Sequence, residues 1–127
     1  MHYPTLDEVL TLHQLTLDAH GGSTGLRDMG LLQSALAAPR QTMFGEELYP
    51  GIADKSAIIL YLLIQNHPFV DGNKRTALSA CFWFLESNGY TLDVENNDLY
   101  QFTLEIAKGQ MNKDTVTSWI REHLRSL

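Results

Sequence analysis

Eight consecutive apolar residues, Ala57 to Ile64, constrain the fold of this chain more than any other feature. Because they are apolar on every side of a helix, the helix that contains them should lie at the buried centre of a domain. The run is far shorter than the roughly 20 residues that a membrane-spanning helix needs. Asp54 is expected to cap the start of this helix. Pro68 disfavours helical geometry in the residue before it, so the helix should end near His67.

Helical spacing of apolar residues continues over most of the chain. Thr5 and Glu8 form a capping box that begins a first helix, which Gly21 and Gly22 end. Further helices are expected from Asp28 to before Pro39, from Asn73 to Asn88, from Asn96 or Asn97 to Gly109, and from near Asn112 through Val116, Trp119, Ile120, His123 and Leu124. Residues 90–94 should be short and extended, and residues 39–53 a long loop or a small hairpin. The prediction is an all-α, single-domain bundle of about six helices over residues 1–127.

Composition and charge exclude several classes of protein. The formal charge of −6 argues against direct nucleic-acid binding through phosphate contacts. The N-terminus lacks the layout of a signal peptide, so a cytoplasmic protein without a membrane partner is expected. The single cysteine, Cys81, lies in an apolar stretch and is interpreted as a buried core residue. The histidines show no zinc-ligand spacing, and His2, His13, His20 and His123 are interpreted as structural.

The segment from His67 to Arg75 carries an imidazole, a carboxylate and two cations within nine residues. Lys74 and Arg75 fall in the first turn of the helix expected from Asn73, where the helix dipole disfavours each cation by roughly 0.3–1 kcal/mol. A bound anion would remove this conflict. Gly72 lets the backbone approach such an anion, and the free N–H groups of the turn favour phosphate. Gly72, Asn73, Lys74 and Arg75 are therefore predicted to bind phosphate.

Asp71 and His67 are the candidates for metal binding and for catalysis. Asp71 would repel a phosphate unless a cation stood between them, and Mg²⁺ is usually held by one or two carboxylates together with substrate phosphates. An imidazole, with an ordinary pKa of about 6.5, suits a general base, so His67 is predicted to accept the proton of an attacking hydroxyl. Phe69 is expected to be the buried anchor of the loop, with Val70 pointing away. These residues predict an enzyme that uses a nucleotide to modify a hydroxyl of another protein.

The residues from His67 to Arg75 resemble the signature of the Fic/Doc family, which reads His-x-Phe-x-Asp/Glu-Gly-Asn-x-Arg, and the match is complete. The layout of the rest of the chain is also similar. The resemblance implies a Fic-like helical bundle that binds ATP and Mg²⁺ at a loop between its two central helices. It implies His67 as the base, Asp71 as the Mg²⁺ ligand, and the turn from Gly72 to Arg75 as the anion site, with Phe69 anchoring the loop.

Two positions distinguish the branches of this family. The branch that transfers AMP has Gly where this chain has Lys74, and a second Arg where this chain has Leu78. The chain instead resembles the death-on-curing (Doc) branch, small toxins that phosphorylate a threonine of elongation factor Tu and stop translation. A lysine side chain would also crowd the turn where the α-phosphate would sit. The resemblance favours a kinase, and AMP transfer and a non-catalytic nucleotide- or partner-binding module are the alternatives.

The resemblance to Doc implies an antitoxin, a helical segment of which lies in a groove on the toxin. The charge of −6 leads to the hypothesis that this partner combines apolar anchors with basic residues. Met43, Phe44 and Tyr49, within residues 39–53, are candidates for a flap that docks the target protein. An ordinary loop packed by its own aromatic residues is the alternative.

Overall fold

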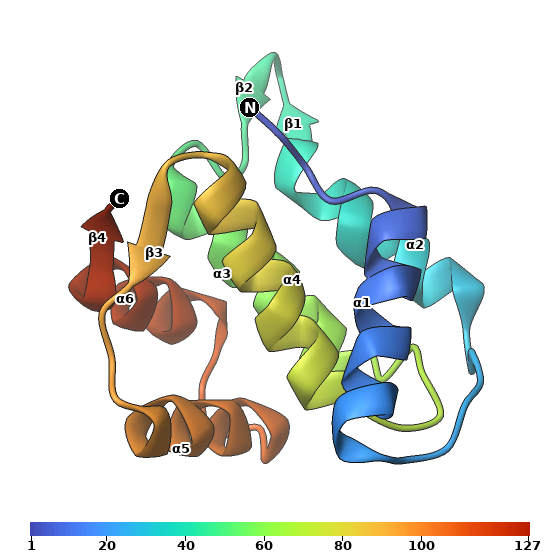
Figure 1. The fold of residues 1–127 in the computed structure, drawn as a ribbon. Coiled ribbons are helices and arrows are strands. Elements are labelled where there is room, and N and C mark those ends of the chain that lie inside the picture. The colour runs from blue at the N-terminus through green and yellow to red at the C-terminus, as the bar shows by residue number, and fades with distance from the viewer.

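The computed structural model describes the whole chain, residues 1–127, as six α-helices with two pairs of short strands (Figure 1). The helices are α1 (Leu6–His20), α2 (Met29–Ala37), α3 (Ile52–Gln65), α4 (Asn73–Ser87), α5 (Asn96–Ala107) and α6 (Lys113–His123), with a 3-10 turn, η1 (Ala38–Arg40). The strands β1 (Thr42–Met43) and β2 (Glu46–Glu47) pair antiparallel, as do β3 (Tyr90–Leu92) and β4 (Leu124–Ser126). The predicted all-α class, with about six helices, is confirmed. None of the helices has the length and hydropathy needed to cross a bilayer.

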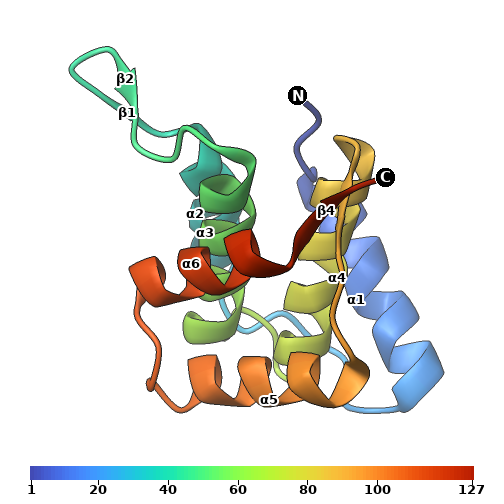
Figure 2. The ribbon, with the colours of Figure 1, turned by 90° about the vertical axis from the view of Figure 1, so that its left-hand side faces the viewer.

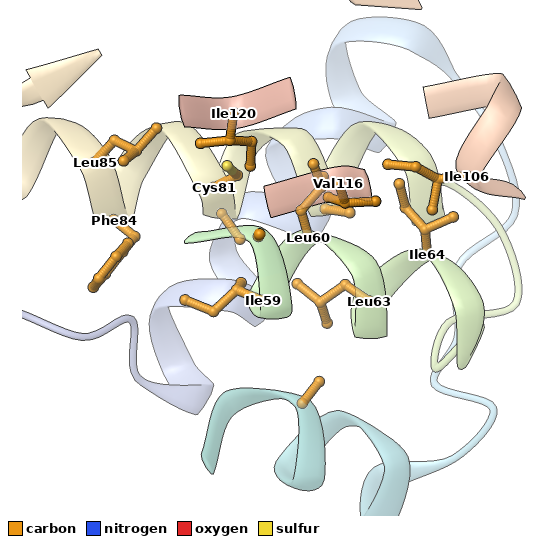
Figure 3. Close-up of a cluster of buried hydrophobic side chains, with 14 of the residues drawn as sticks. Ile59, Leu60, Leu63, Ile64, Cys81, Phe84, Leu85, Ile106, Val116 and Ile120 are labelled. Atoms are coloured by element: carbon orange, nitrogen blue, oxygen red, sulfur yellow. The ribbon is translucent and has the colours of Figure 1, made fainter. Parts of the chain in front are cut away.

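Helix α3 lies at the centre of the bundle, as its apolar run predicts. It packs against α2, α4, α5 and α6, while α1 lies along α4 (Figure 1). Figure 3 shows Leu60 and Ile64 of α3 beside Val116 of α6 and Ile106 of α5, whereas Ile59 and Leu63 lie on another side of the helix. Residues that are fully or almost fully buried in this core include Ile59, Leu60, Leu63, Ile64, Phe84, Leu85, Val116 and Ile120. Cys81 lies among them, and burial raises the pKa of its thiol to about 12, so it is the inert core residue that the sequence predicts.

The capping residues set where the helices begin. The capping box of Thr5 and Glu8 is present, and Asp28 caps α2 by accepting a hydrogen bond from the Leu31 amide. The expectation that Asp54 caps α3 is wrong. The helix begins at Ile52 after Gly51, and the Asp54 carboxylate accepts a hydrogen bond from the Gly51 amide at 3.0 Å. Asp54 is thus the third helical residue, where a carboxylate also stabilises the positive end of the helix dipole.

The end of α6 also differs from the sequence prediction. Leu124 was expected to continue the apolar stripe of this helix, and it belongs instead to β4. The Asp93 amide donates a hydrogen bond to the carbonyl of His123 at 2.8 Å, and Leu124 pairs with Leu92 of β3. Pairing with β3 therefore ends the helix before its hydrophobic pattern does. The C-terminus consequently lies beside β3 (Figure 2).

Residues 39–53 contain a small hairpin, one of the two structures expected there. It projects from the bundle near the start of α3 (Figure 2). Lys55 of α3 is a buried lysine, with 2% of the residue exposed. It holds the two ends of the hairpin segment together. The ammonium donates hydrogen bonds to the carbonyls of Tyr49 and Pro39, the latter at 3.3 Å, and it lies 2.9 Å from a carboxylate oxygen of Glu47.

Replacing Lys55 by methionine should keep the aliphatic packing and loosen the hairpin. The carbonyls of Pro39 and Tyr49 lose a charged donor, so we expect the free energy of unfolding to fall by about 1–3 kcal/mol, measured by urea denaturation. Glu47→Gln is the matched control, because Glu47 is half exposed and glutamine keeps an acceptor oxygen. A larger loss in Glu47→Gln than in Lys55→Met would contradict this account.

Candidate functional site

The motif loop, residues 66–72, connects the end of α3 to the start of α4 (Figure 1). Phe69 is 2% exposed, whereas Val70 beside it is 56% exposed. The side chain of Asn73 binds the backbone of Phe69 on both sides: Oδ1 accepts from the Phe69 N–H and Nδ2 donates to the Phe69 carbonyl, each at 2.9 Å. Packing and a pair of buried hydrogen bonds thus fix the centre of the loop.

His13 of α1 contacts the motif loop through its ring and through a hydrogen bond. Its ring stacks on the ring of Phe69, with centroids 3.8 Å apart and an angle of 9° between the planes. Its Nε2 lies 2.8 Å from the backbone carbonyl of Asp71. Since a carbonyl oxygen only accepts hydrogen bonds, Nε2 carries the ring proton and donates a hydrogen bond to this carbonyl. The structural interpretation of His13 is therefore confirmed, and its contacts position the backbone next to the candidate metal ligand.

The connection between α1 and α2 clamps the other side of the loop. Leu26 forms an antiparallel bridge with Phe69, and the Arg27 N–H donates to the Pro68 carbonyl at 2.7 Å. The Arg27 guanidinium donates to the carbonyls of His67 and Asn66, at 2.6 and 2.5 Å. His67 has a positive φ of 46°, a conformation that non-glycine residues rarely adopt. The hydrogen bond from Arg27 to its carbonyl helps hold this strained backbone.

The carboxylate of Asp71 is oriented by two backbone amides. Oδ2 accepts from the Ser23 N–H at 3.1 Å, and Oδ1 accepts from the Gly72 N–H at 2.8 Å. A Cβ on Gly22 would lie 2.7 Å from Oδ2, so glycine is needed for this close approach. The side chain is exposed, and each oxygen keeps the capacity to bind a further donor or a cation. These hard oxygen donors next to the predicted phosphate-binding turn fit Mg²⁺.

The two amide hydrogen bonds, from Ser23 and then Gly72, hold the pKa of Asp71 below its ordinary value of 3.8. A lowered pKa contributes stability that is present above the unfolded value and is lost as the pH falls through the folded value. The stability advantage of the natural protein over Asp71→Asn should therefore be constant from neutral pH to about pH 5. It should shrink below pH 3.8, as measured by urea unfolding at several pH values. If the stability advantage over Asp71→Asn grew as the pH fell, the lowered pKa of Asp71 would be contradicted.

A cavity of about 310 Å³ opens at the start of α4. The helix begins after Gly72, whose φ of 77° and ψ of 18° are left-handed. The first N–H groups of a helix have no partner within it, so they are available to an anion at this end. The residues that line the cavity are Asp71, Gly72, Asn73, Lys74, Arg75, Leu78, Tyr100 and Thr103. The structure thus brings together the predicted metal ligand and all four predicted phosphate-binding residues, while exposed His67 precedes them and does not line the cavity.

A model of the Fic/DOC family matches residues 3–85. The chain belongs to the Fic/Doc family. It is 40% identical over 111 residues to "Toxin Doc" of Mycolicibacterium smegmatis (strain ATCC 700084 / mc(2)155), covering 87% of this chain and 78% of that protein. It is 27% identical over 121 residues to "Protein kinase doc" of Escherichia phage P1, covering 95% of this chain and 94% of that protein.

A second hollow of this Fic/Doc protein lies between α1 and α4. Its volume is about 430 Å³. Leu12, Leu15, Thr16, Ala19 and His20 line it from α1, and Arg75, Leu78 and Ser79 line it from α4. Arg75 and Leu78 line the first cavity as well, so the groove reaches the candidate phosphate site.

The candidate flap lies away from the Fic/Doc motif. Phe44 at the hairpin tip is 99% exposed and Met43 is 56% exposed, while Tyr49 is half-buried. The hairpin stands near the beginning of α3, whereas the motif loop follows the end of that helix (Figure 1). The structure therefore does not bring these residues next to the loop, and their role in target docking stays a prediction.

Several residues of the site were missed in the sequence. Ser23 and Arg27 lie in the glycine-rich connection between α1 and α2. Three glycines close to an arginine were the only sequence signal that this connection has a specific conformation. Tyr100 and Thr103 gave no signal. Their place in the cavity depends on how α5 packs beside the start of α4, which no local pattern reveals.

Proposed function

We propose that this protein is a toxin that transfers the γ-phosphate of ATP to a serine or threonine hydroxyl of a target protein. A transferase of this kind agrees with the family and with the relative named a protein kinase. An antitoxin is the expected partner, as the relative named Toxin Doc suggests. A cytoplasmic translation factor such as elongation factor Tu is the expected target, and inhibited translation the expected result.

The observation that carries the choice of phosphate transfer is the position of Leu78. It lines the cavity one turn beyond the motif, on the same helix as Lys74 and Arg75. Family members that transfer AMP have an arginine there, which helps to hold the terminal phosphates of ATP. Because leucine replaces that arginine, the only cations that line the cavity are Lys74 and Arg75, in the first turn of α4. This arrangement favours the terminal phosphate at the turn, where a hydroxyl can attack it.

Each motif residue then has a role in the transfer. His67 accepts the proton of the target hydroxyl, because it is exposed and its imidazole is free to face a bound protein. The first turn of α4, with Lys74 and Arg75, binds the phosphate oxygens and stabilises the charge that they carry in the transition state. Mg²⁺ held by Asp71, when bound, would neutralise further charge on the phosphates.

The test uses ATP labelled at either the γ- or the α-phosphate, incubated with the purified protein, Mg²⁺ and a cell extract. His67→Ala protein runs in parallel. Label transferred to a protein band only from the γ-phosphate, and absent with His67→Ala, is the expected result. Label only from the α-phosphate would establish AMP transfer instead. ATP binding without any transfer, also with purified elongation factor Tu, would favour a non-catalytic binding module.

For the antitoxin, the groove between α1 and α4 is the proposed binding surface. Leu15 on its α1 side is 57% exposed and lines the groove together with half-buried Leu12 and Leu78, so a partner could cover a joint apolar surface there. A segment that fills the groove reaches Arg75, which also lines the nucleotide cavity, so binding there would interfere with phosphate binding. Leu15→Asp should weaken antitoxin binding, whereas Leu48→Asp, at an exposed leucine beyond β2, should not. Equal binding by both variants would place the antitoxin elsewhere.

A further inference from the structure

His67 is the proposed base, and its imidazole is exposed and makes no hydrogen bond within the chain. In many enzymes a catalytic base is oriented by a further group that binds its side chain. The imidazole of His67 has no such partner, so its direction is set by the backbone that carries it. This backbone has a positive φ of 46°, a strained conformation that persists only where surrounding contacts hold it.

One residue, Arg27, binds the backbone on both sides of this strained point. Its guanidinium donates from Nε to the His67 carbonyl at 2.6 Å and from Nη2 to the Asn66 carbonyl at 2.5 Å. Its own N–H donates to the Pro68 carbonyl at 2.7 Å. Arg27 therefore holds three successive carbonyls where α3 ends and the motif loop begins. A guanidinium suits this place, because it is a planar fork of donors and because a cation is favourable at the carboxyl end of a helix.

Arg27 is itself fixed to the bundle, although its side chain is exposed. Leu26 before it bridges Phe69, and the N–H of Asp28 after it donates to the Pro68 carbonyl at 3.0 Å. Asp28 also caps α2. Since both neighbours of Arg27 are anchored, its side chain extends from a fixed point toward the two carbonyls. Its hydrogen bonds have a charged donor, and such bonds are roughly twice as strong as neutral ones.

We propose that Arg27 is a positioning residue for the base, which holds the backbone of His67 so that the imidazole faces the acceptor hydroxyl. The inference rests on the proposed function, because it takes His67 as the base of the transfer. Arg27 does not line the cavity at the start of α4, so it acts through His67 and not on the nucleotide. A displacement of a reacting group by about 1 Å can lower a rate about 10²-fold, so the contact matters for kcat.

Initial rates of transfer from γ-labelled ATP test this role in the natural protein, Arg27→Ala, Arg27→Lys and Arg121→Ala. The acceptor is the protein of the labelled band, purified from the extract. Arg27→Ala should lower kcat about 10- to 100-fold and leave KM for ATP unchanged. Arg27→Lys should recover part of this loss, because lysine keeps the charge but lacks the planar fork. Arg121→Ala is the matched control and should keep the natural rate, since Arg121 has a 61% exposed side chain on α6.

A double variant separates positioning of the base from general weakening of the loop. In a His67→Ala protein, Arg27→Ala should cause no further loss of rate, because the group that Arg27 positions is already absent. A crystal structure of Arg27→Ala gives a second measurement that does not depend on activity. The backbone of His67 should leave the positive-φ conformation once the two hydrogen bonds from the guanidinium are lost.

Several results would overturn the inference. Unchanged kcat in Arg27→Ala would show that the contact does not serve the base, and a raised KM for ATP alone would place its effect on the nucleotide. A further 10- to 100-fold loss in the double variant would show that Arg27 acts on another group. If Arg27→Ala does not fold, a natural kcat in Arg27→Lys and in Arg27→Gln would exclude the role. If the natural protein transfers no label while His67 leaves its conformation in Arg27→Ala, the contact stands and the proposed function fails.

Discussion

His67→Ala protein is expected to transfer phosphate to its target about 10²–10⁴ times more slowly than the natural protein, the range that a general base contributes. The contacts of His67 explain why this loss should be confined to catalysis. Its side chain is exposed, and the hydrogen bond that fixes the residue runs from Arg27 to the backbone carbonyl, which alanine also possesses. His67 also does not line the cavity at the start of α4, so affinity for ATP should be unchanged. Initial rates with γ-labelled ATP, together with calorimetric binding of ATP, measure the two quantities separately.

The matched control is His20→Ala. His20 is also an exposed histidine, at the end of α1, and it lines the neighbouring groove together with Arg75. The His20→Ala protein should transfer phosphate at the natural rate, because His20 lies outside the motif loop. A His67→Ala protein that kept its rate would show that another group accepts the proton. Loss of ATP affinity in the same variant would show that His67 acts on the nucleotide rather than on the target hydroxyl.

The fold could be predicted largely because its signals are local. Capping residues and helical periodicity depend on neighbours three or four positions away, so the six helices and their order follow from the sequence. The error at the end of α6 occurs where a partner distant in sequence competes with the local pattern. Leu124 continues the apolar stripe of α6, yet pairing with Leu92 ends the helix before it. The buried ammonium of Lys55 is similar, since its partners become visible only when the hairpin is folded back on α3.

The site shows the same division. His67, Asp71 and the turn from Gly72 to Arg75 are contiguous, so the sequence itself places them close together. The groups that orient them come from other elements: His13 from α1 and Ser23 from the loop after it. A motif therefore predicts which groups act, whereas the precision with which they are held depends on tertiary contacts. Those contacts are where the loop can be weakened without touching a catalytic group.

Asn73→Ala is expected to lower the free energy of unfolding by about 2–4 kcal/mol. Asn73 is 9% exposed, and its side chain satisfies both the N–H and the carbonyl of Phe69, which is 2% exposed. Alanine leaves these two buried backbone groups without partners, and each unsatisfied group costs about 1–3 kcal/mol. Asn73→Asp should also be destabilised, because its carboxylate keeps an acceptor for the N–H but faces the Phe69 carbonyl with a second oxygen. Urea unfolding at neutral pH measures both variants.

The same substitution should weaken nucleotide binding without removing any charge from the site. Phe69 fixes the loop that presents Asp71 and Gly72, so a loop released from Asn73 samples conformations in which the amides and the carboxylate no longer converge on one ligand. The apparent affinity for ATP then falls in proportion to the fraction of protein in the competent conformation. Mg²⁺-dependent ATP binding, measured by calorimetry well below the unfolding temperature, should therefore decrease in Asn73→Ala even though the protein is folded.

Asn88→Ala provides the control, because Asn88 has a similar set of bonds at the opposite end of α4. Its side chain accepts from the His2 N–H at 2.8 Å and donates to the carbonyls of His2 and Phe84, at 2.9 and 2.7 Å. Its loss should reduce stability and leave ATP affinity unchanged, because no motif residue contacts it. If both variants lost affinity in proportion to their lost stability, the effect would be general loosening of α4. A loss of affinity confined to Asn73→Ala would show that the bonds between Asn73 and Phe69 hold the phosphate-binding turn in its competent shape.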